Sequence, residues 1–138
     1  MVRLRMKFGD YTVKGLEKYI RIERKHGWSE LLSNMSTKRS KERLWKNLEQ
    51  LGRVNQNGGV AAVFVEDNPV NLSTAACNFS NVGLDFRSIL FLESKALLEF
   101  GVPIIPIGRG IVKEAFVKQF FDHFVATHKA GTTWYKKG

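Results

Sequence analysis

The stretch from Gly58 to Asp67 constrains the fold most, because it is a continuous apolar run with two glycines before it and two acids after it. A run of this length, dominated by Val and Phe, is typical of a strand buried on both faces inside a parallel sheet. A second apolar run, Val102–Ile107, has one helical pattern before it and another after it. This alternation predicts an α/β fold with a partial parallel sheet flanked by helices.

The number of strands that these runs identify is small for such a sheet. The chain has 138 residues, enough for one domain with a modest core. Two strands do not make a parallel sheet that stands alone. Either further strands lie in the middle of the chain, or another chain supplies them.

The positive charge is concentrated in the first part of the chain. The net charge is +9, and residues 1–53 hold 14 Lys and Arg against 6 Asp and Glu, whereas residues 54–138 hold 8 against 7. Such a balance favours an anionic partner, either nucleic acid or a membrane surface. No apolar run approaches the length of a membrane span, so we expect no membrane partner. The single cysteine, Cys77, fits a reducing compartment.

Two helical patterns in the basic segment predict an antiparallel helical hairpin over residues 1–53. The first runs from an N-cap at Asp10 to Gly27, with apolar Val13, Leu16 and Ile20 on one side. The second begins after Ser36 or Thr37 and runs to Gln50, with Leu44, Trp45, Leu48 and Leu51 on its apolar side.

Each predicted helix carries a basic face. A single such face is equally well explained as a solvated surface, but two in succession favour contact with RNA or DNA phosphates. The cations of the hairpin predicted to bind RNA are Lys14, Lys18, Arg21, Arg24, Lys25, Lys38, Arg39, Lys41, Arg43 and Lys46.

Residues 54–128 form the predicted α/β part, which would complete a sheet with another chain. After the first strand, the pattern of Asn68–Ser88 predicts a surface excursion with one short element near Ala75–Phe79. A helix capped by Ser88 follows, with Leu90, Leu97 and Leu98 on its inner side, and the last helix runs from Ile111 to His128. The last helix buries Ala115, Phe116, Phe120 and Phe124. Residues 129–138 are expected to be a tail.

The turn Gly108-Arg109-Gly110 lies between a strand and a helix, where α/β proteins bind phosphate. A tight turn alone also explains its glycines, although Arg109 could still contact an RNA phosphate. Glu66 and Asp67 end the first strand and are better explained as turn or capping residues than as metal ligands. The sequence offers no zinc pattern and no nucleophile–base pair, so we predict no cofactor, no metal and no catalysis.

Several pieces, taken in order, resemble the C-terminal half of the ribosomal small-subunit protein S-two family. They are the segment Thr37–Arg43 leading into Leu48–Gly52, then Gly58-Gly59, Val63–Val65 with Asp67, and Glu99–Pro103; Thr12–Arg24 looks like the first arm of the family's hairpin. The resemblance implies half of a flavodoxin-like or Rossmann-like fold with a protruding basic hairpin. It also implies a structural protein of the small subunit, bound to rRNA near the head–body junction and touching neighbouring ribosomal proteins.

The sequence departs from the family pattern in two ways, and these change what we expect of the partners and the location of the protein. The Asn68–Ser88 excursion is longer than the family's connection, and the family's first half is absent, so we expect a separate chain to supply it. Fragmented ribosomal proteins are commonest in mitochondria, which places the protein in a mitochondrial ribosome by analogy. Two other functions stay open: a nucleotide-binding α/β enzyme fragment that uses Gly108–Gly110, and a coiled-coil interaction module built on the hairpin.

Overall fold

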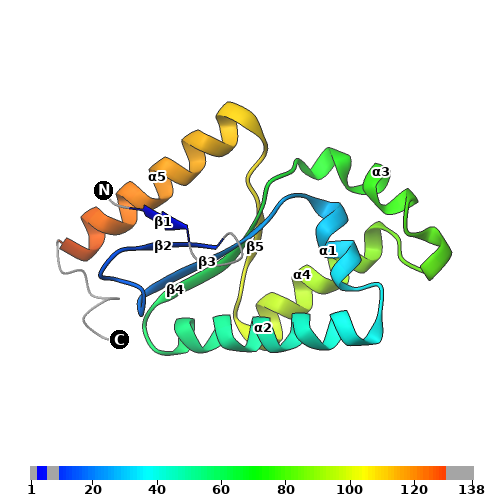
Figure 1. Cartoon of the computed structure of the whole chain (residues 1–138), viewed down its shortest axis with the longest axis horizontal. Helices are drawn as coiled ribbons and strands as arrows, with labels where there is room; N and C mark the ends of the chain where they lie inside the picture. Colours follow the sequence, from blue (N-terminus) through cyan, green and yellow to red (C-terminus); the bar gives the residue numbers. More distant parts are fainter. Residues whose placement is uncertain (1–2, 6–9, 130–138) are drawn as a thin grey trace.

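A mixed five-stranded sheet forms the centre of the computed structural model, which describes residues 3–5 and 10–129 (Figure 1). Its strands lie side by side in chain order: β1 (Arg3–Arg5), β2 (Tyr11–Val13), β3 (Ile20–Lys25), β4 (Val60–Val65) and β5 (Ile104–Pro106). β3, β4 and β5 are parallel, whereas β1 and β2 join the β3 edge as antiparallel strands. The predicted α/β fold is therefore confirmed, with more strands than the two that the sequence identified.

β4 is the central strand that the apolar run predicts. Residues Ala61 to Val65 are all buried, and the strand pairs along its whole length with β3 and over three residues with β5. A strand with neighbours on both sides and helices on both faces has no exposed surface, which explains why its sequence is continuously apolar.

The predicted first arm of the helical hairpin is wrong, because residues 11–25 form two antiparallel strands instead. In β3, Ile20 and Ile22 are fully buried and alternate with charged residues, which is the two-residue period of a strand. The turn between the strands contains Gly15 at a φ of 85°, a left-handed conformation that glycine adopts without strain. The Thr12 hydroxyl donates to the carbonyl oxygen of Ile20, 2.7 Å away, and holds the turn closed.

The second basic helix exists and is longer than predicted. α2 (Lys38–Gln56) begins at Thr37, whose side chain accepts from the Ser40 N–H while the Ser40 side chain accepts from the Thr37 N–H. A short helix, α1 (Trp28–Asn34), precedes it and buries Trp28, Leu31 and Leu32. The predicted domain limit at residue 53 thus falls inside α2, and β3 from the predicted hairpin lies within the sheet.

The later helices match the predicted positions but not all of the predicted faces. α4 (Phe86–Phe100) is capped by Asp85, with Ser88 as the other member of its capping box. Its buried side chains are Ile89, Leu92 and Ala96, whereas Leu90, Leu97 and Leu98 are 47%, 55% and 83% exposed, so the predicted inner side is wrong. α5 (Gly110–Lys129) buries Val117, Phe121 and Phe124; Phe116 and Phe120 are half-buried and Ala115 is exposed.

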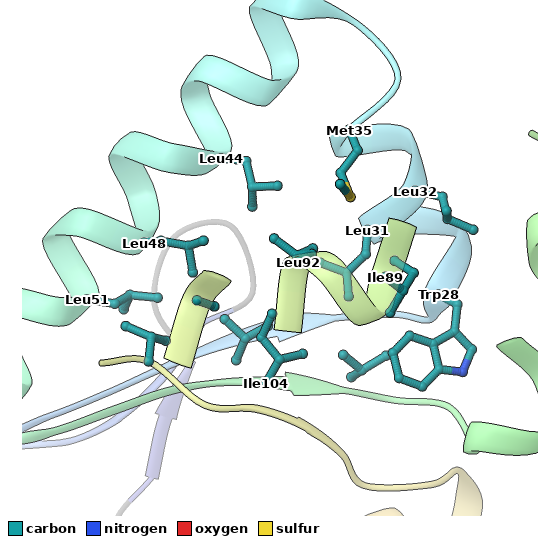
Figure 2. Close-up of a cluster of buried hydrophobic side chains, with 14 of the residues drawn as sticks. Trp28, Leu31, Leu32, Met35, Leu44, Leu48, Leu51, Ile89, Leu92 and Ile104 are labelled. Atoms are coloured by element: carbon teal, nitrogen blue, oxygen red, sulfur yellow. The ribbon is translucent and has the colours of Figure 1, made fainter. Parts of the chain in front are cut away.

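Two hydrophobic clusters cover the two faces of the sheet. On one face, α1, α2 and α4 pack against Ala61, Val63 and Val65 of β4, and Figure 2 shows the leucines of α2 pointing toward α4 and the sheet. On the other face, α5 packs against Ala62 and Phe64 of β4 and against Ile20 and Ile22 of β3 (Figure 1). Because β4 contributes to both clusters, the sheet and its helices form one folding unit.

The connection after β4 contains three short elements: η2 (Pro69–Asn71), α3 (Leu72–Cys77) and η3 (Ser80–Val82). It corresponds to the predicted surface excursion, and α3 overlaps the short element predicted near Ala75. Of the predicted tail, only Lys129 lies within the described residues, as the end of α5. No helix in the described part of the chain has the length and hydropathy needed to span a membrane.

Candidate nucleic-acid interface

The exposed side of α2 carries the densest group of cations in the described structure. We call it the α2 ridge and define it as Lys38, Arg39, Lys41, Arg43 and Lys46. All are exposed except Lys41, which is half-buried, and no carboxylate among the described residues forms an ion pair with any of them. Glu42 is the one acid within the same stretch. The ridge therefore presents five cations without a described ion-pair partner, and Glu42 offsets one of the five charges.

The geometry of the ridge follows from the helical repeat. Arg39, Arg43 and Lys46 stand at i, i+4 and i+7, so they share one face and span about 10 Å along the helix axis. The opposite side of α2 is anchored by Leu44, Leu48 and Leu51, all buried. The chain thus presents three guanidinium or ammonium groups in a row from a rigid support.

Two further predicted RNA contacts, Lys14 and Lys18, lie on the turn between β2 and β3. Both are exposed and neither forms an ion pair with a described carboxylate. Although the helix predicted for this segment is absent, these two side chains remain available to an anion.

Four of the predicted RNA-binding residues have carboxylate partners. Arg24 donates to Glu66 at 2.6 Å, and both side chains are about nine-tenths buried. Arg109 donates to Asp67 at 3.0 Å, Arg21 lies 3.9 Å from Asp10, and buried Lys25 lies between Glu23 and Glu30 at 3.8 and 3.7 Å. These partners neutralise most of the charge that the sequence assigned to RNA at the four positions.

Glu66 and Asp67 organise the carboxyl ends of the three parallel strands. Besides Arg24, Glu66 has Lys113 and His26 nearby, each 3.7 Å away. Asp67 accepts hydrogen bonds from Asn71, Arg109 and the N–H groups of Asn68 and Trp28. Burial disfavours the ionised form of Asp67, but the hydrogen bonds outweigh it and lower the pKa of the carboxyl. We call Arg24, His26, Glu66, Asp67, Arg109 and Lys113 the strand-end cluster.

The turn Gly108-Arg109-Gly110 belongs to this cluster. Gly108 and Gly110 have φ values of 79° and 61°, the left-handed region that favours glycine. The Gly108 N–H donates to the Asp67 carbonyl oxygen at 3.1 Å, and the Arg109 guanidinium donates to the Asp67 carboxylate. The Gly108 N–H and one nitrogen of the Arg109 guanidinium are therefore engaged within the protein.

A charged pocket that the sequence did not reveal lies between β3 and α2. This β3–α2 pocket has a volume of about 500 Å³ and is lined by Asp10, Arg21, Glu23, Lys25, Asn34, Ser40, Arg43, Leu44 and Asn47. The available signal was the alternation in β3, which places Arg21, Glu23 and Lys25 together on the face turned toward α2.

Within the described residues, no group of three or more His, Cys, Asp or Glu side chains is arranged to hold a metal ion. Cys77 is an exposed free thiol. Comparisons of the chain with protein-family models, with curated proteins and with solved structures return no significant match. The function must therefore be argued from the geometry and charge of the chain itself.

Proposed function

We propose that this protein is an RNA-binding structural component of the small ribosomal subunit, with the α2 ridge as its main RNA contact. The observation that carries the proposal is the row of unneutralised cations on α2. Protein–RNA affinity depends strongly on the neutralisation of phosphates by Lys and Arg, so a row of free cations on a rigid helix is a suitable surface.

The assignment to the ribosome rests on the resemblance to the S-two family, and the structure removes one part of it. The Thr12–Arg24 piece, which looks like a helical arm, is a strand-turn-strand unit. The remaining pieces support the proposal: a basic helix, a glycine-led buried strand ending in an acid, and the helix that ends at Phe100-Gly101 before β5. A mitochondrial ribosome remains part of the proposal by analogy with other fragmented ribosomal proteins.

Protein neighbours are also part of the proposal. α4 turns Leu90, Phe91, Leu97 and Leu98 outward, and Leu98 is 83% exposed. Apolar side chains gathered on one helix face are typical of a surface that another protein covers. Neighbouring ribosomal proteins, or a separate chain related to the family's first half, are the partners that the resemblance suggests.

The proposal is tested by sedimentation. A tagged copy of the protein, expressed in its own cells, should cosediment with small ribosomal subunits at low magnesium, where the two subunits separate. The variant Arg39→Ala/Arg43→Ala/Lys46→Ala should be depleted from that fraction.

The matched control removes three other cations. Arg53, Arg87 and Lys118 each lie within 2.7 Å of an exposed carboxylate, so the triple alanine variant at these positions loses the same formal charge without touching the ridge. It should sediment like the original protein. Sedimentation only at the top of the gradient for the unchanged protein would refute the ribosomal assignment.

The enzyme alternative predicts a different result. A nucleotide-binding turn at Gly108–Gly110 would give saturable heat with ATP, GTP or NAD in calorimetry. Because Gly108 N–H and Arg109 already bind Asp67, we expect no such heat.

A further inference from the structure

A mostly apolar groove runs along α5, on the face of the sheet that has fewer helices. In the described part of the chain α5 is the helix that covers this face, whereas α1, α2 and α4 pack on the other face (Figure 1). This α5 groove has a volume of about 660 Å³. Its walls are Val60 of β4 and one side of α5, which contributes Val112, Ala115, Phe116, Gln119, Phe120, His123, Phe124 and Thr127. Apolar surface gathered in this way is typical of a place that another segment covers.

The sheet holds the aromatic floor of the groove in place. The rings of Phe116 and Phe120 meet Phe64 of β4 edge to face, with ring centroids 5.3 and 5.1 Å apart. Phe64 is fully buried, whereas Phe116 and Phe120 are half-buried and Val112, at the far end of the groove, is 62% exposed. Edge-to-face contacts stabilise aromatic pairs beyond the area that they bury, so the two rings are held against β4 without an occupant.

The chain itself contains a segment that suits this groove. α5 ends at Lys129, two residues beyond Thr127, and residues 130–138 follow it outside the described residues. Gly131 comes two positions after the helix, where a left-handed glycine commonly turns the chain away from the helix axis. Trp134 and Tyr135 follow, and then Lys136 and Lys137. The segment thus combines a place to turn back with two large aromatic side chains.

The length of the segment matches the groove. From Thr127 back to Val112 the groove follows about 22 Å of helix axis, whereas nine extended residues span up to about 30 Å. With the turn at Gly131, the next three residues cover about 10 Å back along the helix. Phe124 lies about 8 Å and Phe120 about 14 Å back from Lys129, so Trp134 falls between them.

Polar groups at the groove also suit these two aromatics. Buried Trp and Tyr side chains usually keep a hydrogen bond for their N–H or O–H group, and the exposed side chains of Gln119 and His123 line the groove. The two lysines that follow Tyr135 can bury their stems and leave their ammonium groups in water.

We propose that residues 130–138 fold back along α5 and place Trp134 and Tyr135 in the α5 groove. Each of these side chains buries about 150–250 Å², enough to cover the half-buried rings of Phe116 and Phe120. The segment then completes the cover of this face of the sheet, and the outward side of α4 remains the apolar surface for partner proteins. This inference is independent of the proposed RNA-binding function.

The test is fluorine NMR of the full-length protein labelled with fluorotryptophan, which gives one resonance for each of Trp28, Trp45 and Trp134. Trp134→Phe identifies the resonance of Trp134 without changing the described fold. A soluble nitroxide should broaden this resonance several-fold less in the folded protein than in urea. Trp28 is 2% exposed and lies on the other face of the sheet, so its resonance shows whether each variant is folded.

Two matched variants locate the contact. His123→Glu puts a carboxylate beside the docked ring, and it should raise the broadening of Trp134 toward the value in urea, because burying an unpaired charge is unfavourable. Ala126→Glu adds the same side chain at an exposed α5 position that does not line the groove, and it should leave the broadening unchanged.

Three results would overturn the proposal. The first is a Trp134 resonance that is broadened as strongly in the folded protein as in urea. The second is protection that His123→Glu does not change, which would place the segment elsewhere. The third is protection that disappears on dilution, which would make the tail of a second copy the occupant. None of these results depends on RNA binding, so the proposed function is tested separately.

Discussion

The α2 ridge and the strand-end cluster are both rich in Lys and Arg, but they differ in whether these cations have carboxylate partners. In the strand-end cluster Arg24, Arg109 and Lys113 face Glu66 and Asp67 at 2.6 to 3.7 Å. On the α2 ridge no described carboxylate forms an ion pair with any of the five cations. The difference shows that a count of basic residues overstates the surface available to RNA, because part of the charge holds the fold together.

The largest expected effect comes from breaking the strand-end cluster. Glu66→Ala would leave the buried Arg24 guanidinium without its partner, which typically costs about 3–5 kcal/mol of folding free energy. The effect should appear in denaturant unfolding as a lower midpoint with an unchanged slope.

A control distinguishes loss of the pair from loss of volume. Glu66→Gln keeps the volume of the side chain but removes its negative charge, so it should retain most of the cost if the ion pair is what stabilises the fold. A cost near zero for Glu66→Gln would assign the effect of Glu66→Ala to lost volume. If Glu66→Ala left the free energy of unfolding within about 0.5 kcal/mol of the original value, a range usual for surface changes, the cluster would not be a structural element.

A smaller effect on stability is expected at Asp10, because the nearby cations only partly offset the burial of its carboxylate. Burial raises the pKa of Asp10 from 3.8 to about 6, and Glu23 adds to the shift while Arg21 and Lys25 oppose it. The folded state therefore keeps a proton that the unfolded state loses, so this group's contribution to stability is complete below pH 3.8 and is lost as the pH rises through about 6.

Asp10→Asn cannot ionise and should stabilise the protein at pH 7 by up to about 3 kcal/mol, since one pKa unit corresponds to about 1.4 kcal/mol. It should also flatten the stability profile between pH 4 and 6. Thermal unfolding across this range measures both effects. A variant that is less stable at pH 7, with the original pH profile, would contradict this account of Asp10.

The next effect concerns the start of α2, which sets the direction of the ridge. Thr37→Ala removes the side-chain acceptor of the Ser40 N–H and one half of the capping box, at a cost of about 1 kcal/mol. Thr37→Asp keeps an acceptor at the N-cap and should restore the midpoint of urea unfolding. Equal losses in the two variants would mean that the cap contributes nothing.

The sequence predicted well where one local pattern had one explanation. The buried run at Val60–Val65, the cap at Thr37 and the helix ends at Gly101 and Gly110 are local signals, and the structure has elements there. Residues 10–25 were predicted wrongly because two periods fit them: Lys14, Lys18, Arg21 and Lys25 recur at helical spacing, while Ile20 and Ile22 alternate as in a strand. Parallel pairing of β3 with β4 decides between them, and that pairing joins residues 40 positions apart.

Contacts between distant segments also limit what the sequence could predict about the candidate interface. The cations of the α2 ridge were identified from sequence because one amphipathic helix orients them all. The pairing of Arg24 with Glu66 and of Arg109 with Asp67 spans 42 positions in each case and depends on how the sheet assembles. The side chains that line the β3–α2 pocket come mainly from β3, α1 and α2, so no single segment contains the pattern.

The central claim is that free cations on α2, rather than basic residues in general, bind RNA. The most direct measurement is the slope of log affinity against log salt concentration for small-subunit rRNA. Arg39→Ala/Arg43→Ala/Lys46→Ala should change the free energy of unfolding by less than about 0.5 kcal/mol. It should flatten the slope by roughly 0.7–0.9 for each phosphate that the variant no longer neutralises, about 2–3 in total. An unchanged slope and affinity in this variant would contradict the account and make the ridge an ordinary solvated surface.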